Sequence, residues 1–207
     1  MERQELINKV KTRIDEVSSE GELIVDVGIE NTKPYDSIID ELLDESALEV
    51  LLKAPFYRLA VSKAENLVCT PVANDKSIGK ISVPNDFIRL VSFKMSDWQQ
   101  SVTSLAQPGD ELARKQSNKY IRGGIAKPVG VLKNTPDGLV IEYYSVKQSD
   151  THSLEEFYYI KKDTAENITD AQMIDAMVWI CAGKTLGVLN QVNLQNVCFE
   201  NAKGLLV

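Results

Sequence analysis

The sequence predicts an α+β protein in which helices from both ends of the chain form one bundle and a small antiparallel β-region is inserted between them. Before residue 68 and after residue 163 the apolar residues recur with the helical period of about 3.6, whereas residues 69–162 contain short alternating runs. Strands grouped apart from helices are typical of α+β chains. We therefore expect N-terminal helices in residues 1–68, a β-rich insertion in residues 69–162, and C-terminal helices in residues 163–207 that complete the helical body.

The first helix is predicted from apolar residues that share one face between positions 6 and 17. Gly21 is expected to end it, since glycine is a common C-terminal stop. Apolar residues alternate in residues 22–30, which predicts either a short strand or an extended, packed connection. Pro34 suits the first turn of a second helix, because its missing N–H is not needed there.

A third helix is predicted from the spacing of Ser46 and Glu49, which is that of a capping box. Pro55 is expected to kink or restart this helix, which then continues to about Leu67. The residues expected to share one helical core are Leu6, Ile14, Ile38, Leu42, Ile174, Met177 and Val178.

The middle of the chain predicts roughly five short strands. Residues 130–145 have the pattern of a hairpin, and its turn at residues 134–138 contains Asn, Pro, Asp and Gly. Residues 155–162 predict a further strand. Residues 107–127 are polar and contain a pair of glycines, so we expect a long loop there.

The C-terminal part predicts two helices. Thr169 and Gln172 have capping-box spacing at the start of the first, Asn190 separates the two, and Gly204 is expected to end the second. Close approach by another helix is expected at three small residues, Ala182, Gly183 and Gly187.

The composition argues against several classes of protein. The 207 residues include 30 acidic and 23 basic ones, a net charge of −7, whereas tight nucleic-acid binding depends on Lys and Arg. The three cysteines are odd in number and lack zinc-ligand spacing, which predicts reduced thiols. The N-terminus has no apolar signal-peptide core, and no stretch approaches the ~20 apolar residues of a membrane span. We therefore expect a soluble intracellular protein with no metal, no cofactor and no membrane contact.

The sequence offers no recognisable catalytic motif. Gly183-Lys184-Thr185 resembles the end of a Walker motif, but position 178 is Val where the motif requires Gly. His152, the single histidine, lies in a polar stretch without a triad partner, so we interpret it as an exposed loop residue. Carboxylate clusters in residues 40–45 and 155–156 are interpreted as solvated charge, with a role at a subunit surface as the alternative. We therefore predict that the protein is not an enzyme.

Two features are candidates for protein–protein contact. Adjacent strand residues face opposite sides, so one tyrosine of each doublet at residues 143–144 and 158–159 is expected outside the core. Outward tyrosines often anchor interfaces, which makes Tyr144 and Tyr158 candidates, with a merely exposed ring as the alternative. The apolar end, Leu205-Leu206-Val207, is a candidate docking tail, with a frayed terminus as its alternative.

Three stretches follow the ordered pattern of a known family. They are VPNDFIRLVSF at residues 83–93, PDGLVIEYYS at residues 136–145 and DAQMIDAMVWICAGKTLGVLN at residues 170–190. In this pattern the chain resembles the podovirus head-to-tail connector adaptor family, also called tail tubular protein A or gatekeeper, and the connector ring protein of a crAss-like phage would suit. The first stretch is closest to a family motif, whereas residues 107–127 have no counterpart in the family.

The resemblance implies a structural virion protein of the phage neck, assembled in the host cytoplasm, with no catalysis and no cofactor. It implies a homo-oligomeric, dodecameric ring that docks beneath the portal protein, contacts downstream tail or ring proteins, and lines the DNA channel. A closed ring arises from heterologous contacts between identical subunits, and a net-negative lumen would let packaged DNA slide past without specific binding. The alternatives are a monomeric intracellular protein-binding module and a small enzyme with an unrecognised site.

Overall fold

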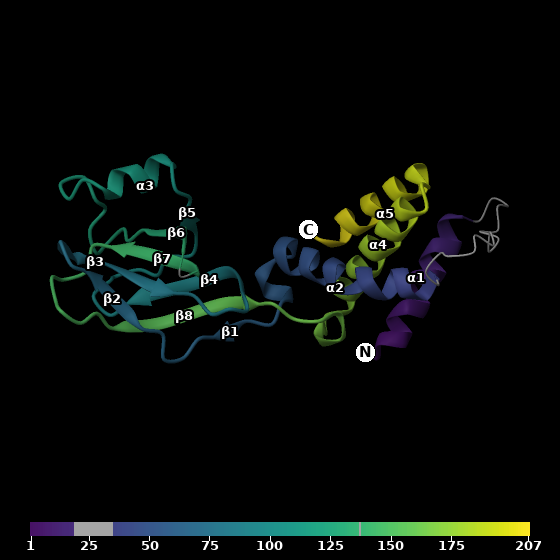
Figure 1. The fold of residues 1–207 in the computed structure, drawn as a ribbon, viewed down its shortest axis with the longest axis horizontal. Helices are drawn as coiled ribbons and strands as arrows, with labels where there is room; N and C mark the ends of the chain where they lie inside the picture. Colours follow the sequence, from purple (N-terminus) through teal and green to yellow (C-terminus); the bar gives the residue numbers. More distant parts are fainter. Residues whose placement is uncertain (19–34, 137) are drawn as a thin grey trace. The chain divides into compact units, whose positions relative to one another are not determined.

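The computed structural model describes residues 1–18, 35–136 and 138–207 of the chain. These residues contain both helices and two β-sheets, which confirms the predicted α+β class. The chain divides into two compact units (Figure 1). The helical unit comprises Met1–Ala60 and Lys162–Val207, and the β unit comprises Val61–Lys161.

The helical unit is organised around α4, which contacts the three other long helices. Its helices, including two short 3-10 turns, are α1 (Arg3–Val17), α2 (Tyr35–Lys53), η1 (Phe56–Arg58), η2 (Ala165–Asn167), α4 (Ala171–Val188) and α5 (Val192–Leu205). Most residues of α4 are buried, as expected for a helix that is apolar on nearly all sides. Asp170 rather than Thr169 caps α4, because its carboxylate accepts a 3.0 Å hydrogen bond from the backbone N–H of Met173.

The separate third helix predicted near Ser46 is wrong. Helix α2 runs without interruption to Lys53, and the Ser46 hydroxyl donates to the Leu42 carbonyl 2.7 Å away, as serines inside helices do. The predicted continuation to Leu67 is also wrong, since Pro55 is followed by a 3-10 turn and then by a short strand at residues 62–63. The predictions made for Gly21, residues 22–30 and Pro34 lie outside the described residues.

Five of the seven predicted helical-core residues are buried, and the other two are half-buried. In α2 the fully buried residues are Ile39 and Leu43, each one position after the predicted Ile38 and Leu42. Positions 38 and 39 are both Ile, and positions 42 and 43 are both Leu. The helical period alone therefore does not determine which residue of each pair faces the core.

The predicted close approach between helices is confirmed where α4 meets α5. A Cβ added at Gly183 would lie 2.7 Å from the Phe199 ring, and one at Gly187 would lie 2.7 Å from the Gln195 side chain. Asn190, with a φ of +59°, separates the two helices as expected.

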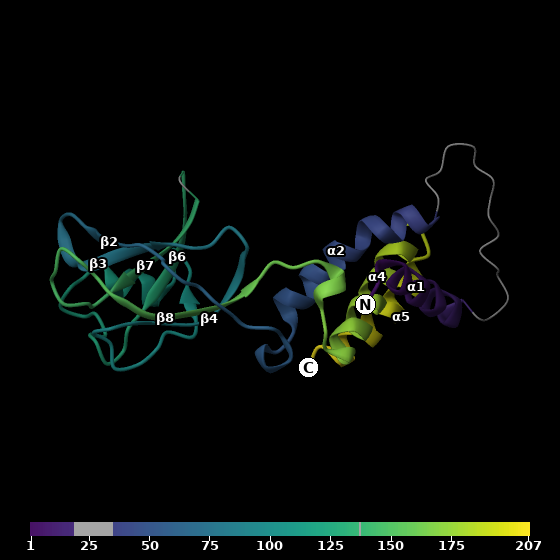
Figure 2. The ribbon, with the colours of Figure 1, turned by 90° about the horizontal axis from the view of Figure 1, so that it is seen from below.

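The β unit contains two sheets whose residues share one core. The three-stranded sheet has the order β1-β8-β4, and its strands are β1 (Ser62–Lys63), β4 (Phe87–Met95) and β8 (Leu154–Lys161). The five-stranded sheet has the order β2-β3-β7-β6-β5, and its strands are β2 (Cys69–Val72), β3 (Asp75–Ser82), β5 (Leu105–Ala106), β6 (Gly130–Thr135) and β7 (Gly138–Tyr144). Figure 2 shows the long strands of both sheets side by side in this unit.

The prediction of roughly five antiparallel strands is only partly right. The described residues form eight strands, and β5 pairs with β6 in parallel. The predicted hairpin is confirmed as β6–β7, which is closed by the pair Thr135–Gly138 with Gly138 at a φ of +114°. The predicted strand at residues 155–162 is confirmed as β8. The long loop predicted at residues 107–127 is only partly right, because it contains the short helix α3 (Glu111–Gln116).

Candidate interaction site

Residues 107–127 form an arm between β5 and β6 that carries the short helix α3 (Figure 1). Four large apolar side chains of this arm are exposed, namely Leu112 at 54%, Tyr120 at 84%, Ile121 at 56% and Ile125 at 40%. Contiguous exposed apolar surface commonly marks an interaction site, and Tyr120 and Ile121 are adjacent in the chain. The arm is therefore the candidate contact surface of the β unit.

Arg122 fixes the arm to the five-stranded sheet. Its Nη1 donates to Asp75 Oδ2 at 3.0 Å and to Ser77 Oγ at 3.1 Å, both at the start of β3. Its Nε donates to the Gln116 carbonyl at 2.6 Å, which ties the end of α3 to the same guanidinium. Only 8% of the Arg122 side chain is exposed. The hydrogen bonds of Ser77 and the neighbouring Arg122 hold the pKa of Asp75 below its usual value, so the pair is ionised at neutral pH.

Further contacts shape the rest of the arm. The backbone N–H of Gln99 donates to the Ile125 carbonyl at 3.0 Å, and the N–H of Gln107 donates to Asp110 Oδ2 at 2.7 Å. A Cβ at Gly123 would lie 2.3 Å from the Lys127 carbonyl, so only glycine fits there without a shift. The arm thus presents its apolar side chains from a defined backbone.

The arm is basic in an acidic chain. It contains two acidic and five basic residues, a net charge of +3 against −7 for the whole chain. Its exposed basic residues are Arg114, Lys115, Lys119 and Lys127. Lys119 lies 5.2 Å from the centre of the Tyr120 ring, which places a cation beside the most exposed aromatic side chain of the arm.

Helix α2 presents the opposite charge. Between Tyr35 and Lys53 the sequence has six acidic residues and one basic residue, a net charge of −5. The outer face of α2 comprises four exposed residues at helical spacing, Glu41, Asp44, Glu45 and Leu52.

Several carboxylates of the 40–45 cluster take part in ion pairs within the helical unit, which corrects their interpretation as merely solvated charge. Arg3 reaches Asp40, Asp44 (3.3 Å) and Glu166 (2.8 Å). The side-chain hydrogen bond from Arg3 keeps the pKa of Glu166 below its usual value. Lys184, in the middle of α4, reaches Glu45 at 2.8 Å, which supports the structural rather than phosphate-binding interpretation of the Gly183-Lys184-Thr185 stretch.

The two predicted interface tyrosines differ in their surroundings. Tyr144 is only 5% exposed, so the prediction that its ring is available on the surface is wrong. Its hydroxyl donates to Glu142, and the Arg122 guanidinium lies 5.7 Å from the centre of its ring, so the anchor of the arm covers the outer side of β7. Tyr158 is half-buried in β8, next to the buried Tyr159, whose hydroxyl donates to Asp86 at 3.1 Å.

The apolar C-terminal end lies partly against the core of its own unit. Leu205 and Leu206 pack against the helical core, and Gln172 Nε2 donates to the Leu205 carbonyl at 2.7 Å. Val207 is 85% exposed. Of the predicted docking tail, only Val207 is therefore largely available to a partner.

His152 lies in a loop just before β8, as predicted, but it is half-buried rather than exposed, and it bridges two strands. Its Nε2 lies 2.9 Å from the Lys76 carbonyl, and its Nδ1 lies 2.6 Å from the hydroxyl of Tyr143. Because a carbonyl can only accept, Nε2 donates to Lys76 and Nδ1 accepts from Tyr143. Both ring nitrogens thereby have hydrogen-bond partners, which gives His152 a structural role.

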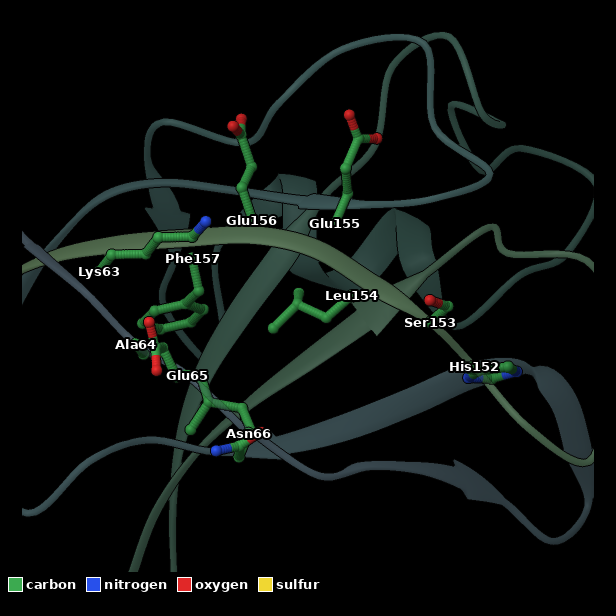
Figure 3. Close-up of a pocket in the computed structure, with 11 residues that line it drawn as sticks. Lys63, Ala64, Glu65, Asn66, His152, Ser153, Leu154, Glu155, Glu156 and Phe157 are labelled. Carbon is green, nitrogen blue, oxygen red and sulfur yellow. The ribbon is translucent and has the colours of Figure 1, made fainter.

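A hollow of about 490 Å³ lies beside β8 and is lined by residues 63–67 and 152–157. Figure 3 shows that Lys63, His152 and Glu156 do not point toward a common centre. Acid–base chemistry needs groups that converge on one reacting atom. We therefore assign no chemistry to this hollow.

Comparisons with known proteins do not narrow the function. Neither a scan against protein-family models nor a search of curated proteins found a match to this chain.

Among the residues described, no three His, Cys, Asp or Glu side chains gather as a potential metal site. None of the helices in those same ranges combines the length and the apolar character that crossing a membrane requires.

The arm was missed in the sequence because its polar residues and paired glycines predict a plain loop. The sequence does contain one indication of an interaction site, which is the presence of four large apolar residues in this otherwise polar connection. A solvent-exposed loop without a partner does not require such residues.

Proposed function

We propose that this chain is a structural subunit of a ring in the head-to-tail connector of a tailed phage. In this role the ring docks beneath the portal protein, contacts the downstream tail or ring proteins, and surrounds the path of the packaged DNA. The subunit is assembled in the host cytoplasm and resides in the neck of the virion.

The observation that carries this proposal is that one chain has two different, complementary surfaces. The arm is apolar and basic, with a net charge of +3, and α2 is acidic, with a net charge of −5. A ring of identical subunits needs such heterologous contacts, in which one surface of each copy meets a different surface of the next. A monomeric binding module would need only one of them.

The resemblance to the connector adaptor family supports the same proposal. The stretch at residues 83–93 leads into β4, where Phe87 stacks on Tyr159 with ring centres 6.0 Å apart. Asp86 of the same stretch accepts the hydrogen bond from the Tyr159 hydroxyl. The residues that carry the resemblance therefore have a folding role in the β unit, which is the unit that bears the arm.

The test is to co-express the full chain with the portal protein encoded in the same genome and to measure the mass of the purified complex. A portal complex that contains multiple copies of this chain, and that electron microscopy shows as a ring below the portal, is the expected result. A chain that stays monomeric and does not co-purify with the portal would contradict the proposal. A portal complex with a single bound copy would instead favour a monomeric binding module.

A further inference from the structure

We infer that the arm of one copy binds the outer face of α2 in a second copy of this chain. This inference rests on the proposed function and deepens it, because it names the two surfaces that meet between neighbouring subunits. It requires surfaces that match in both apolar character and charge.

The apolar match involves the tip of the arm and the end of α2. Tyr120 and Ile121 are adjacent and more than half exposed, and Leu112 of α3 is 54% exposed. Beyond the acidic residues of α2, Leu52 is 49% exposed, and Tyr57 of the following 3-10 turn is 77% exposed. Aromatic and aliphatic side chains of this kind provide the central contacts of protein interfaces, with charged residues around them.

The charge match sets which surfaces can meet. Two arms facing each other would bring together the exposed Arg114, Lys119 and Lys127 of both copies. Two α2 helices would bring together acidic faces, because Asp44 and Glu45 remain 50% and 62% exposed although Arg3 and Lys184 pair with them. Both symmetric pairings bring like charges together, which disfavours them. Only the pairing of arm with α2 joins opposite charges, and that pairing is heterologous, as a ring requires.

Nucleic acid is a weaker candidate for the arm. Arg122 is already held by Asp75 and Ser77, and Lys115 forms a 2.7 Å ion pair with Glu111. Fewer cations are then free to neutralise phosphates, on a chain whose net charge is −7. An acidic helix with an apolar end suits the arm better than a uniform row of phosphates.

The direct experiment places a photo-crosslinking residue at position 120 of the full chain. Equal amounts of nitrogen-15-labelled and unlabelled protein are mixed, with the portal protein present, irradiated and digested. Mass spectrometry then separates cross-links within one copy from cross-links between copies. We expect mixed-isotope products that join position 120 to residues 35–58.

Charge-reversal variants test the same contact without the cross-linker. Lys119→Glu in the arm and Glu41→Lys on the outer face of α2 are each expected to weaken association of copies at least tenfold, measured by sedimentation over a concentration series. Mixing the two variants should restore part of the association, because the reversed charges then face each other. Lys147→Glu is the matched control, since this lysine is 80% exposed in the β unit but outside the arm. Circular dichroism verifies that each variant is folded.

The outcomes separate this inference from the proposed function. If copies assemble on the portal but position 120 cross-links elsewhere, the arm contact is wrong and the ring proposal stands. If the cross-links lie within one copy, the arm binds its own chain, which also overturns the inference. If the arm variant loses salt-sensitive DNA binding instead of self-association, the arm is a nucleic-acid contact. If no assembly occurs even with the portal, the proposed function itself fails.

Discussion

The helical unit and the β unit are stabilised by different kinds of side chain. The fully buried cluster of the helical unit, among the residues described, consists of Leu, Ile, Val, Ala, Met and Cys. The core of the β unit is built on aromatic rings, with Phe93 centred 5.2 Å from Trp98 and 6.1 Å from Phe157. Small residues let helices pack closely, whereas large rings fill the wider space between two sheets.

The two units also differ in charge. The sequence of the helical unit has 19 acidic and 10 basic residues, a net charge of −9, and that of the β unit has 11 acidic and 13 basic residues, a net charge of +2. The overall charge of −7 therefore conceals a division within the chain. The net charge of the whole chain is therefore a poor guide to what each surface of this protein can bind.

The largest expected effect is on the aromatic core. Phe157→Ala removes a fully buried ring that contacts Phe87, Phe93 and Tyr159, and should lower the free energy of unfolding by about 3–5 kcal/mol. Urea denaturation measures the loss, and hydrogen exchange of the β-unit amides shows where it occurs. A loss below about 0.5 kcal/mol is typical of surface changes and would contradict the assigned core.

The equivalent change in the helical unit is Met177→Ala. Met177 is fully buried against aliphatic neighbours, and its truncation should cost about 2–5 kcal/mol. Because the two units have separate cores, exchange should increase mainly in α1, α2, α4 and α5. Equal increases in both units would mean that the chain unfolds as a single cooperative body.

A glycine-to-alanine change should have opposite signs in the two units. A Cβ at Gly79 would lie 2.1 Å from the Tyr143 hydroxyl, so Gly79→Ala should destabilise the protein by about 1–3 kcal/mol. Gly204 lies in α5 with no atom near its added Cβ, so Gly204→Ala should stabilise it by up to about 1 kcal/mol. Thermal melts of the two variants compare them directly, and a stabilising Gly79→Ala would refute the close contact.

Local chemistry explains which elements could be predicted from the sequence. The β6–β7 hairpin was predictable because its turn residues specify it locally, and α4 because nearly all of its residues are apolar. The start of α4 was misplaced by one residue, since Thr169 and Asp170 are both good capping residues and only the fold selects one. The helix start predicted at Ser46 is wrong for a related reason. A serine side chain can cap the N-terminus of a helix, or it can donate a hydrogen bond to a backbone carbonyl one turn earlier inside a helix.

The arm was not predictable because non-local contacts hold it. The ion pair between Arg122 and Asp75 joins residues that are 47 positions apart, so no local sequence pattern predicts it. The same contact explains the error at Tyr144, since strand alternation predicts an outward ring but cannot predict that Arg122 covers it. Strand alternation thus points to tyrosines in the strands, whereas the exposed apolar surface of the β unit includes the arm between two strands.

A smaller effect is expected at the C-terminus. Leu206→Ala trims a half-buried side chain from the helical core and should cost about 1 kcal/mol, whereas deletion of the exposed Val207 should leave stability within about 0.5 kcal/mol. Chemical denaturation of both variants provides the measurement. If Leu206→Ala folds with unchanged stability but no longer assembles with the portal, then Leu206 is a docking residue as the sequence first indicated.

The smallest expected effect is the response of the arm to acid. Hydrogen bonds from Ser77 and the nearby Arg122 lower the pKa of Asp75 in the folded chain. A carboxyl group with a lowered folded pKa contributes stability above its unfolded value of about 3.9, and that contribution disappears as the pH falls through the folded pKa. Amide exchange in residues 107–127, corrected for the intrinsic effect of pH, should therefore increase below about pH 4, by an amount on the order of 1 kcal/mol or less. Asp75→Asn removes the titrating group, so its arm should exchange faster already at neutral pH and show no further change at this carboxyl's transition. An acid response that persists unchanged in Asp75→Asn would assign it to another carboxylate, and the arm would then owe its position chiefly to the bonds from Arg122 to the Gln116 carbonyl and the Ser77 hydroxyl.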